Sequence, residues 1–202
     1  MCPFTKPNTL IFPLSDQVGS DISLINSTLL QQLAQSNPPL KKEELEQIIK
    51  EHLIFLMSGG AGGHWNTILI KGLVLGVYKG PEGKKGKQAS FEKTHLKPDL
   101  EFSSLELPFA NFCAVFAPQV SFFNSDLSHC LFTDAILEKA IFKKSNLHGS
   151  DFSRANLAEA SFVNSDCSDV DFENCNLTGA DFRGARLNGA RFPGAQLDQV
   201  IF

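Results

Sequence analysis

The sequence predicts a mainly β fold, with a β-solenoid over residues 89–202 and a small capping region of helices and short strands over residues 1–88. The first observation behind this prediction is a period of five. From residue 102 onward, nineteen of twenty-one positions spaced five apart are Phe or Leu, in strict alternation, and Ala117 and Cys167 are the only departures. The second observation is a series two positions earlier, from Ala110 to Val200, in which every residue is small or β-branched.

A period of five fits neither an α-helix nor a regular strand, which repeat every 3.6 and 2.0 residues. The chain must therefore bend in each repeat and turn one large and one small side chain inward. Such a path closes into a coil, and stacked coils bury both inward series while their backbones pair at about 4.8 Å. Each buried Phe or Leu should contribute roughly 1.5–3 kcal/mol. A tube filled in this way leaves no room for a cofactor, and we expect none.

Individual repeats have a recognisable sequence. The runs 150–154 (SDFSR), 155–159 (ANLAE) and 180–184 (ADFRG) resemble the repeats of the pentapeptide-repeat family. The resemblance covers at least residues 102–202, and it implies a right-handed quadrilateral parallel β-helix with four repeats in each coil. Phe91 and Leu96 keep the step of five but lie one residue out of phase, so we expect an extra residue near residues 97–99.

Four repeats in a coil place residues twenty apart in one vertical stack, and the outward residues support this spacing independently. Asp166 is twenty positions before Arg186, and Asp171 is twenty positions before Arg191. Opposite charges would therefore meet between neighbouring coils. Amide side chains recur at the same spacing, at Asn156, Asn176 and Gln196.

The N-terminal region resembles no family, and its pattern predicts two helices and a hairpin. Apolar residues at helical spacing predict a helix over residues 20–35, which the following Ser36–Pro39 would end. A second helix should begin at about Lys41 and end at Gly59-Gly60, with an apolar face made of Leu45, Ile48, Ile49, Leu53 and Leu56. Residues 67–70 and 73–78 flank Lys71-Gly72, which is typical of a hairpin or an irregular first coil.

Large apolar side chains at outward positions gather in the first coils. They are Phe109, Phe116, Phe123, Leu131, Ile136 and Ile141. An exposed apolar patch on a solenoid needs a partner. We expect the chain's own N-terminal helices to dock there as a cap, with an external protein as the alternative.

Motifs with possible chemistry are weak. The run 59–63 (GGAGG) follows no clear strand and precedes no Lys-Ser or Lys-Thr, so a helix-ending turn is the better interpretation than a phosphate loop. In the run 79–87, Gly80 and Gly86 lie six apart and Gln88 replaces the Ser or Thr of a Walker A motif. We interpret this run as a solvated basic loop, with binding to phosphate or an acidic partner as the alternative.

Histidine and cysteine side chains also lack a complete site. His129 and His148 should share a face of successive coils, but no third metal ligand is evident. Cys130, Cys167 and Cys175 occupy inward positions, as buried apolar cysteines do. Nothing assembles a nucleophile, a base and an oxyanion site. We therefore expect no catalytic and no metal-binding residues, and no enzyme.

Composition predicts a soluble, cytoplasmic protein. The opening Met1–Phe4 has neither the basic nor the apolar part of a secretory signal, and the longest uncharged apolar run, Leu53–Met57, is too short to span a bilayer. Five cysteines without a CxxC pair suit a reducing compartment. The net charge of −4 favours no direct binding to nucleic acid or membrane.

Two classes of function remain, and both are non-catalytic. The first is a structural scaffold for protein–protein interaction. The second is implied by the resemblance, because some bacterial pentapeptide-repeat proteins mimic duplex DNA and bind DNA gyrase or topoisomerase IV. The net charge of −6 over residues 89–202 agrees with it, with an acidic surface formed by Asp166, Asp169, Asp171 and Glu173. A secreted bacterial effector is a further alternative.

The final repeat suggests a homodimer. Val200 lies in the small inward position, Phe202 is a repeat centre, and Ile201 lies beside them. An uncovered coil exposes unpaired backbone groups and the apolar end of the tube, as an open sheet edge does. Two copies related by a twofold axis would cover each other. We therefore expect these three residues to form a dimer interface.

Overall fold

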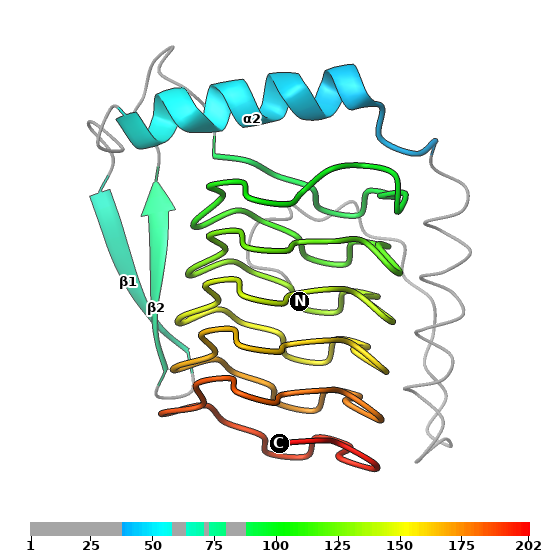
Figure 1. Cartoon of the computed structure of the whole chain (residues 1–202). Coiled ribbons are helices and arrows are strands. Elements are labelled where there is room, and N and C mark those ends of the chain that lie inside the picture. The colour runs from blue at the N-terminus through cyan, green and yellow to red at the C-terminus, as the bar shows by residue number, and fades with distance from the viewer. Residues whose placement is uncertain (1–37, 58–63, 71–72, 80–87) are drawn as a thin grey trace, which may run out of the picture.

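The structure is a computed structural model that describes residues 38–57 and 88–202 in full and the backbone of residues 64–70 and 73–79. Helix α2 spans Lys42–Met57. Strands β1, His64–Ile70, and β2, Leu73–Lys79, follow it. The remainder is a solenoid, and α2 lies across one end of it, opposite the end at which the described chain stops (Figure 1).

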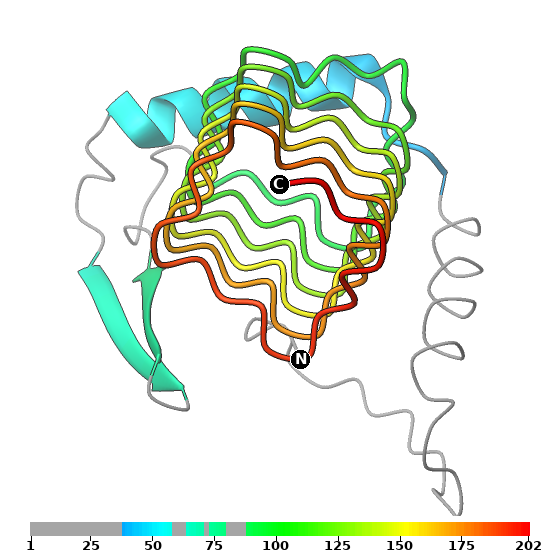
Figure 2. The ribbon, with the colours of Figure 1, turned by 60° about the horizontal axis from the view of Figure 1, so that its bottom comes forward.

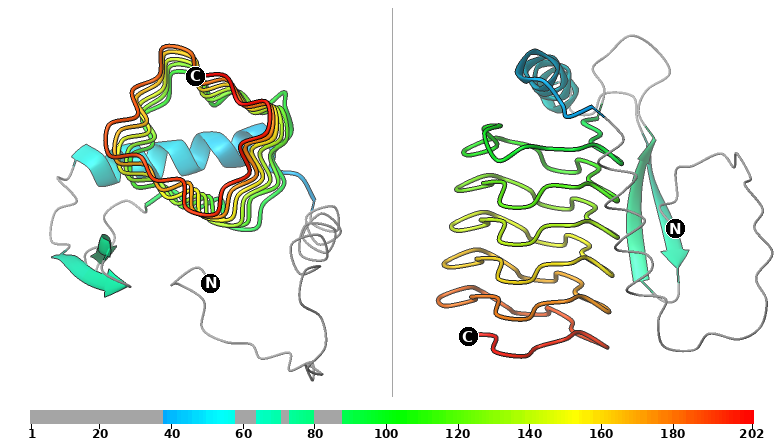
Figure 3. Two further views of the ribbon diagram at one scale, coloured as in Figure 1. Left: turned by 90° about the horizontal axis from the view of Figure 1, so that it is seen from below. Right: turned by 90° about the vertical axis from the view of Figure 1, so that its right-hand side faces the viewer.

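The solenoid consists of stacked coils that pair in parallel. Single bridges join residues twenty apart, as in Leu131 to Asp151 and Asp151 to Asp171. A coil therefore takes twenty residues, that is four repeats, and a view near the axis shows the coils superposed (Figure 2), with a four-sided outline (Figure 3). At the first coil the spacing is twenty-one, from Ser90 to Asn111. The predicted extra residue is thus confirmed, whereas the right-handed sense of the coil stays a prediction.

The core contains a pair of aromatic columns. One contains Phe102 and every twentieth residue after it, and the other contains Phe91 and then every twentieth residue from Phe112. Consecutive rings within a column have centroids 4.5–5.7 Å apart. Rings of opposite columns meet edge to face, as Phe142 and Phe152 do at 5.5 Å, which suits the quadrupole of the ring. The centres from Phe91 to Phe182, and the small series from Ala110 to Ala180, are buried, so the predicted inward assignment is confirmed.

Each repeat bends at the residue two positions after its centre, where the backbone adopts a positive φ. Lys139 has φ 57° and Gly189 has φ 74°. A left-handed residue with a Cβ costs roughly 1–2 kcal/mol, whereas glycine adopts this conformation freely. Most of these positions carry a side chain and therefore bear this cost. The stacking of neighbouring coils offsets it.

Helix α2 closes the tube at its first coil. Glu43 and Glu44 lie in its first turn, where carboxylates favour a helix N-terminus, and the Glu44 carboxylate accepts a hydrogen bond from the Lys41 backbone N–H at 2.9 Å. Leu45 belongs to the buried core cluster of the solenoid. The Leu40 N–H also donates to the carbonyl of His95 in the first coil at 2.9 Å.

The buried face of α2 differs from the predicted one. His52 and Phe55 are buried with Leu45, whereas Leu53 is exposed, so its assignment to the apolar face was wrong. The physical reason is a polar contact. The Nδ1 atom of His52 accepts a hydrogen bond from the Ala89 N–H at 3.1 Å, which turns this side of the helix to the tube.

Strands β1 and β2 form a separate antiparallel sheet. Ile70 pairs with Leu73, and the pairing continues to His64 with Lys79. This confirms the hairpin interpretation. The helix expected over residues 20–35 and the glycine-rich and basic runs at 59–63 and 79–87 lie mostly or entirely outside the described residues.

Candidate interaction surfaces

The solenoid presents four sides. Side 1 begins with residues 100–104, side 2 with 105–109, side 3 with 110–114 and side 4 with 115–119, and each recurs every twenty residues. Within a repeat, three side chains point outward in columns: the residue before the centre and the two residues after it. From residue 100 onward, the formal charge is +1 on side 1, −3 on side 2, −2 on side 3 and −2 on side 4.

The six apolar residues predicted as a docking surface are distributed over all four sides. They are Phe123 and Ile141 on side 1, Phe109 on side 2, Leu131 on side 3, and Phe116 and Ile136 on side 4. Their exposure differs widely. Ile136 is 4% exposed, whereas Phe123 and Ile141 are 37% and 39% exposed. The described contacts of α2 go to the end of the tube, so docking of N-terminal residues on these six stays a prediction.

One compact cluster stands out on side 1, and we call Phe123, Ile141, Lys143, Lys144 and Val163 the side 1 patch. Phe123, Lys143 and Val163 follow one another in a single outward column, one coil apart. The ammonium of Lys144 lies 5.8 Å from the centroid of the Phe123 ring. Neither lysine takes part in any of the ion pairs formed within the described residues.

Elsewhere, charges of neighbouring coils neutralise each other. The guanidinium groups of Arg186 and Arg191 lie 3.4 Å from the carboxylates of Asp166 and Asp171, as predicted from the spacing of twenty. Sequence reasoning missed two further pairs at the same spacing. Arg154 donates two hydrogen bonds of 2.7 Å to Asp134, and Lys139 lies 3.5 Å from Glu159. A systematic search of the sequence at this spacing would have found both.

The four residues of the predicted acidic surface are divided between two adjacent sides of the solenoid. Asp166 and Asp169 lie on side 2, and Asp171 and Glu173 lie on side 3. Hydrogen bonds from Ser168 lower the pKa of Asp166. Burial raises the pKa of Asp171, in spite of its contact with Arg191. These four carboxylates therefore differ in environment and are partly neutralised.

Aromatic side chains form a short column on side 2. The ring of His129 stacks on Phe109 at 5.2 Å, and the ring of His148 meets His129 edge to face at 5.3 Å. The Nδ1 atom of His148 lies 3.8 Å from a carboxylate oxygen of Asp169. Burial lowers the pKa of His129, and His148 lowers it further. Within the part of the chain that the structure describes, no group of three or more metal-ligating side chains is formed.

The inward cysteines are unsuited to nucleophilic chemistry. Cys130, Cys167 and Cys175 are buried in the tube. Burial raises the pKa of Cys167 and Cys175 to about 12, and it raises that of Cys130 as well. The protonated thiols of Cys130 and Cys175 donate to the carbonyls of Leu107 and Phe152 at 3.1 and 2.8 Å. Since the thiolate is the nucleophile, these residues are inert at neutral pH.

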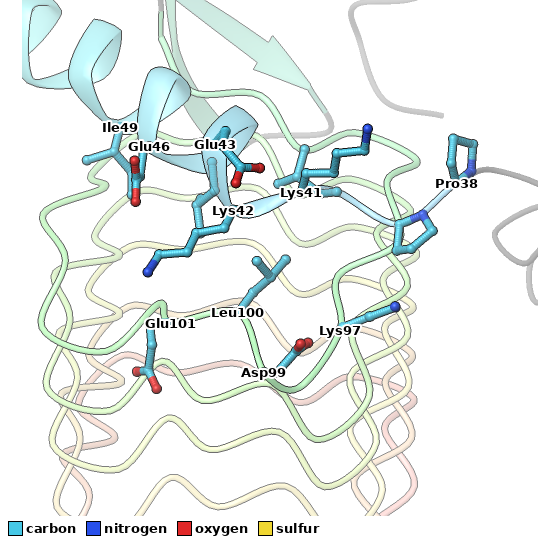
Figure 4. Close-up of a pocket in the computed structure, with 13 residues that line it drawn as sticks. Pro38, Lys41, Lys42, Glu43, Glu46, Ile49, Lys97, Asp99, Leu100 and Glu101 are labelled. Atoms are coloured by element: carbon cyan, nitrogen blue, oxygen red, sulfur yellow. The ribbon is translucent and has the colours of Figure 1, made fainter.

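A groove of about 690 Å³ lies between the start of α2 and the irregular part of the first coil (Figure 4). Its apolar lining includes Leu45, Ile49 and Leu100. Charged side chains of both signs surround these residues, including Lys42 from the helix and Glu101 from the coil. Such a mixture of charges selects no particular ligand chemistry.

The coil at the opposite end, residues 183–202, is the most exposed of the solenoid. Leu197 and Phe202, which are repeat centres, are 42% and 64% exposed, and Ile201 is 49% exposed. The three residues of the predicted dimer interface, Val200, Ile201 and Phe202, therefore lie at an accessible apolar surface.

The parallel bridges at a spacing of twenty and the filled aromatic core define a β-solenoid protein. A family comparison specifies the repeat, because residues 135–202 match the model described as a pentapeptide repeat region. This part of the chain is thus a pentapeptide-repeat solenoid, as its sequence indicated. No curated protein sequence matches the chain.

Solved structures of pentapeptide-repeat proteins are similar to the chain. Rfr23 from the cyanobacterium Cyanothece 51142 has 20% identity and a TM-score of 0.42, over 57% of this chain and 88% of that one. A protein from the Arabidopsis thaliana thylakoid lumen has 27% identity and a TM-score of 0.38, over 47% and 63%. Trypsin-treated QnrB1, a plasmid-mediated fluoroquinolone resistance protein, has 20% identity and a TM-score of 0.29, over 56% and 65%.

A membrane-spanning helix would need a longer apolar run than α2 offers. Among the described residues, no helix is long and apolar enough to cross a bilayer.

Proposed function

We propose that this chain is a non-catalytic protein-interaction scaffold of the pentapeptide-repeat type. The side 1 patch is the observation that carries the proposal. It combines two exposed apolar side chains, Phe123 and Ile141, with two lysines that belong to no ion pair among the described residues, on a rigid polar solenoid. A rigid frame lowers the entropy cost of binding, because its outward side chains already lie at fixed spacing. The buried, protonated cysteines support a non-catalytic role.

The charge arrangement gives less support to the DNA-mimicking alternative. A DNA mimic needs regular rows of free carboxylates, whereas Asp134, Asp166 and Asp171 each contact an arginine of the next coil. A supercoiling assay with purified DNA gyrase and the full chain separates the two functions. We expect no inhibition. Inhibition at stoichiometric concentrations would favour the DNA-mimicking function over the scaffold.

Site-specific crosslinking tests the scaffold directly. Asn124, His129, Asp134 and Lys139 occupy the same outward column position on sides 1, 2, 3 and 4 in turn. A photoreactive amino acid at each of these positions, in the full chain added to an extract of the source organism, reports what each side contacts. We expect discrete protein adducts, strongest from position 124. The absence of adducts from all four positions would contradict a scaffold function.

We also propose that two copies associate through Val200, Ile201 and Phe202. The exposed apolar groups of the last coil support this, because a second copy would remove them from water. Light scattering should give about twice the chain mass of 22.1 kDa, and Phe202→Asp should halve it. Phe123→Asp, a matched change on side 1, should leave the mass unchanged. A wild-type chain that is monomeric at high concentration would refute the dimer. A cytoplasmic localisation remains part of this proposal.

A further inference from the structure

Side 1 differs from the other three sides of the solenoid in charge, and among the coils before the last one it alone presents large exposed apolar side chains. Side 1 alone carries a net positive charge from residue 100 onward, while the other three sides are negative. Its exposed apolar residues, Phe123 and Ile141, lie beside Lys143 and Lys144 on two successive coils. In the next coil, Val163 extends the column.

The two lysines are also unlike the other cations of the central coils. Arg154 contacts Asp134 and Lys139 contacts Glu159, so both cations already have carboxylate partners. Lys143 and Lys144 belong to no ion pair among the described residues, and the outward neighbours of Lys144 in its column are Asn124 and Asn164. An acidic partner would therefore meet positive charges that no carboxylate of this surface competes for.

We propose that the side 1 patch binds an acidic protein segment that carries an aliphatic or aromatic anchor. This inference rests on the proposed scaffold function and specifies the chemistry of the partner. Carboxylates of the segment pair with Lys143 and Lys144, while its apolar side chain packs between Phe123 and Ile141. Apolar anchors supply most of the affinity at such sites, and the charges supply selectivity and the rate of encounter.

Other partners fit the patch less well. Stable binding to nucleic acid takes on the order of six to ten phosphate contacts, and a polybasic membrane site takes about four to eight cations. The patch offers two. The net charges of sides 2, 3 and 4 would also repel either polyanion. A second copy of the chain could present acidic side 2 to side 1, but such a heterologous contact would assemble rings or filaments rather than a twofold dimer.

Peptide selection on the immobilised full chain tests the proposal. A random displayed peptide library is selected on the wild type and counter-selected on the Lys143→Glu, Lys144→Glu double variant. We expect the enriched sequences to be rich in Asp and Glu around a Leu, Ile, Phe or Trp. Enrichment of basic sequences, or of the same sequences on the double variant, would overturn the proposal.

Fluorescence anisotropy with one enriched peptide then measures how much the lysines and the apolar side chains of the patch contribute to binding. The double lysine variant should bind at least about tenfold more weakly, and Phe123→Ser with Ile141→Ser should abolish binding. Lys50→Glu with Lys97→Glu is the matched control, since it makes the same charge change at two exposed lysines outside the side 1 patch; it should bind as the wild type does. Equal affinity of the double lysine variant and the wild type would overturn the proposal. Because lysine substitutions at the surface leave the core intact, this arm stands even if the apolar variant unfolds.

Three further outcomes separate the alternatives. Tighter binding of a labelled single-stranded oligonucleotide than of the acidic peptide would replace the proposal with a nucleic-acid site. Tighter binding to vesicles of phosphatidylglycerol and phosphatidylcholine would replace it with a membrane site. Growth of scattering with concentration, suppressed by the lysine substitutions, would assign the patch to a second copy. Crosslinks from sides 2, 3 or 4 without any from side 1 would refute this inference and leave the scaffold function standing.

Discussion

The two ends of the solenoid are built from the same repeat, yet only one of them is buried. At the first coil, Phe91 and Leu96 are fully buried because α2 lies over them. At the last coil, Leu197 and Phe202 are repeat centres too, and they remain exposed. A repeat centre is therefore buried by its neighbours along the axis rather than by its own coil. The helix does for the first coil what a following coil does for every other one.

The largest expected effect contrasts a central ring with a terminal one. Phe152→Ala removes a ring that stacks on Phe132 and Phe172, so we expect the free energy of unfolding to fall by about 3–5 kcal/mol. Phe202→Ala should cost under about 1 kcal/mol, because its ring is mostly exposed already. Chemical denaturation of both variants measures the difference. Equal losses of stability in the two variants would contradict the conclusion that neighbouring coils bury a repeat centre.

The second prediction concerns the effect of low pH on stability, which should act at the end of the solenoid that α2 covers. Burial lowers the pKa of His52 from 6.5 to about 4, partly offset by the Pro108 carbonyl. Between these two pH values the unfolded chain therefore binds a proton at His52 that the folded chain does not bind. The contribution of neutral His52 to the free energy of unfolding is fully present above about pH 6.5. It is lost as the pH falls toward 4, by up to about 3 kcal/mol. A protonated ring would also lose the hydrogen bond from the Ala89 N–H, which Nδ1 accepts.

Denaturation between pH 7 and pH 4 checks this effect of His52. His52→Gln should remove most of the pH dependence that lies between these limits, whereas His148→Gln, on side 2, should keep most of it. If both variants follow the wild-type profile, His52 does not link the cap to pH.

A smaller effect is expected at the bends. A Cβ at Gly189 would overlap a carboxylate oxygen of Asp169, at a φ of 74°. Gly189→Ala should therefore destabilise by roughly 1–2 kcal/mol. Lys139→Gly, at the same position of an earlier repeat, should be neutral or slightly stabilising. Thermal melts compare the two, and adding Asp169→Ala should relieve only the steric part of the Gly189→Ala penalty. No loss in Gly189→Ala would show that the bend tolerates any residue.

The smallest effect is the coupling between coils at the surface. Double-mutant cycles should return about 0.2–1 kcal/mol for Asp134 with Arg154 and for Asp171 with Arg191, since both arginines are substantially exposed. The bidentate pair, Asp134 with Arg154, should give the larger value. Additive single substitutions at low salt would mean that these pairs contribute nothing to the stacking of coils.

Much of the solenoid could be predicted because its period is strict. The spacing of Asp166 and Arg186 indicates four repeats in a coil, and the phase of Phe91 indicates the extra residue before residue 102. The buried face of α2 could not be predicted, because His52 is polar and is buried only through its contact with Ala89. Hydrophobic periodicity favoured Leu53 instead.

The side 1 patch was only partly visible in the sequence. Phe123 and Ile141 were recognised as outward and apolar, but they were grouped by closeness along the chain with residues such as Leu131, which lies on another side. Because the sides recur every twenty residues, the residue number alone assigns each outward residue to a side. This assignment would have separated Phe123 and Ile141 from residues such as Leu131. The lack of ion pairs at Lys143 and Lys144 needed coordinates, because it depends on which neighbouring side chains reach them.

The twenty-residue coil also determines which insertions and deletions the gene can tolerate. Loss of one whole coil would shorten the rod and return every later residue to its original side. Loss of a single repeat, such as residues 125–129, would keep inward positions inward, but it would move every later repeat-centre Phe into a Leu column and shift all later residues by one side. Phe123 and Ile141 would then no longer share a side. A shift of one residue would reverse inward and outward positions, and the described chain accommodates it only in the first coil, beneath α2. Length variation in this fold therefore has three units: five residues keep inward positions inward, ten also keep the Phe and Leu columns, and twenty also keep the outward sides.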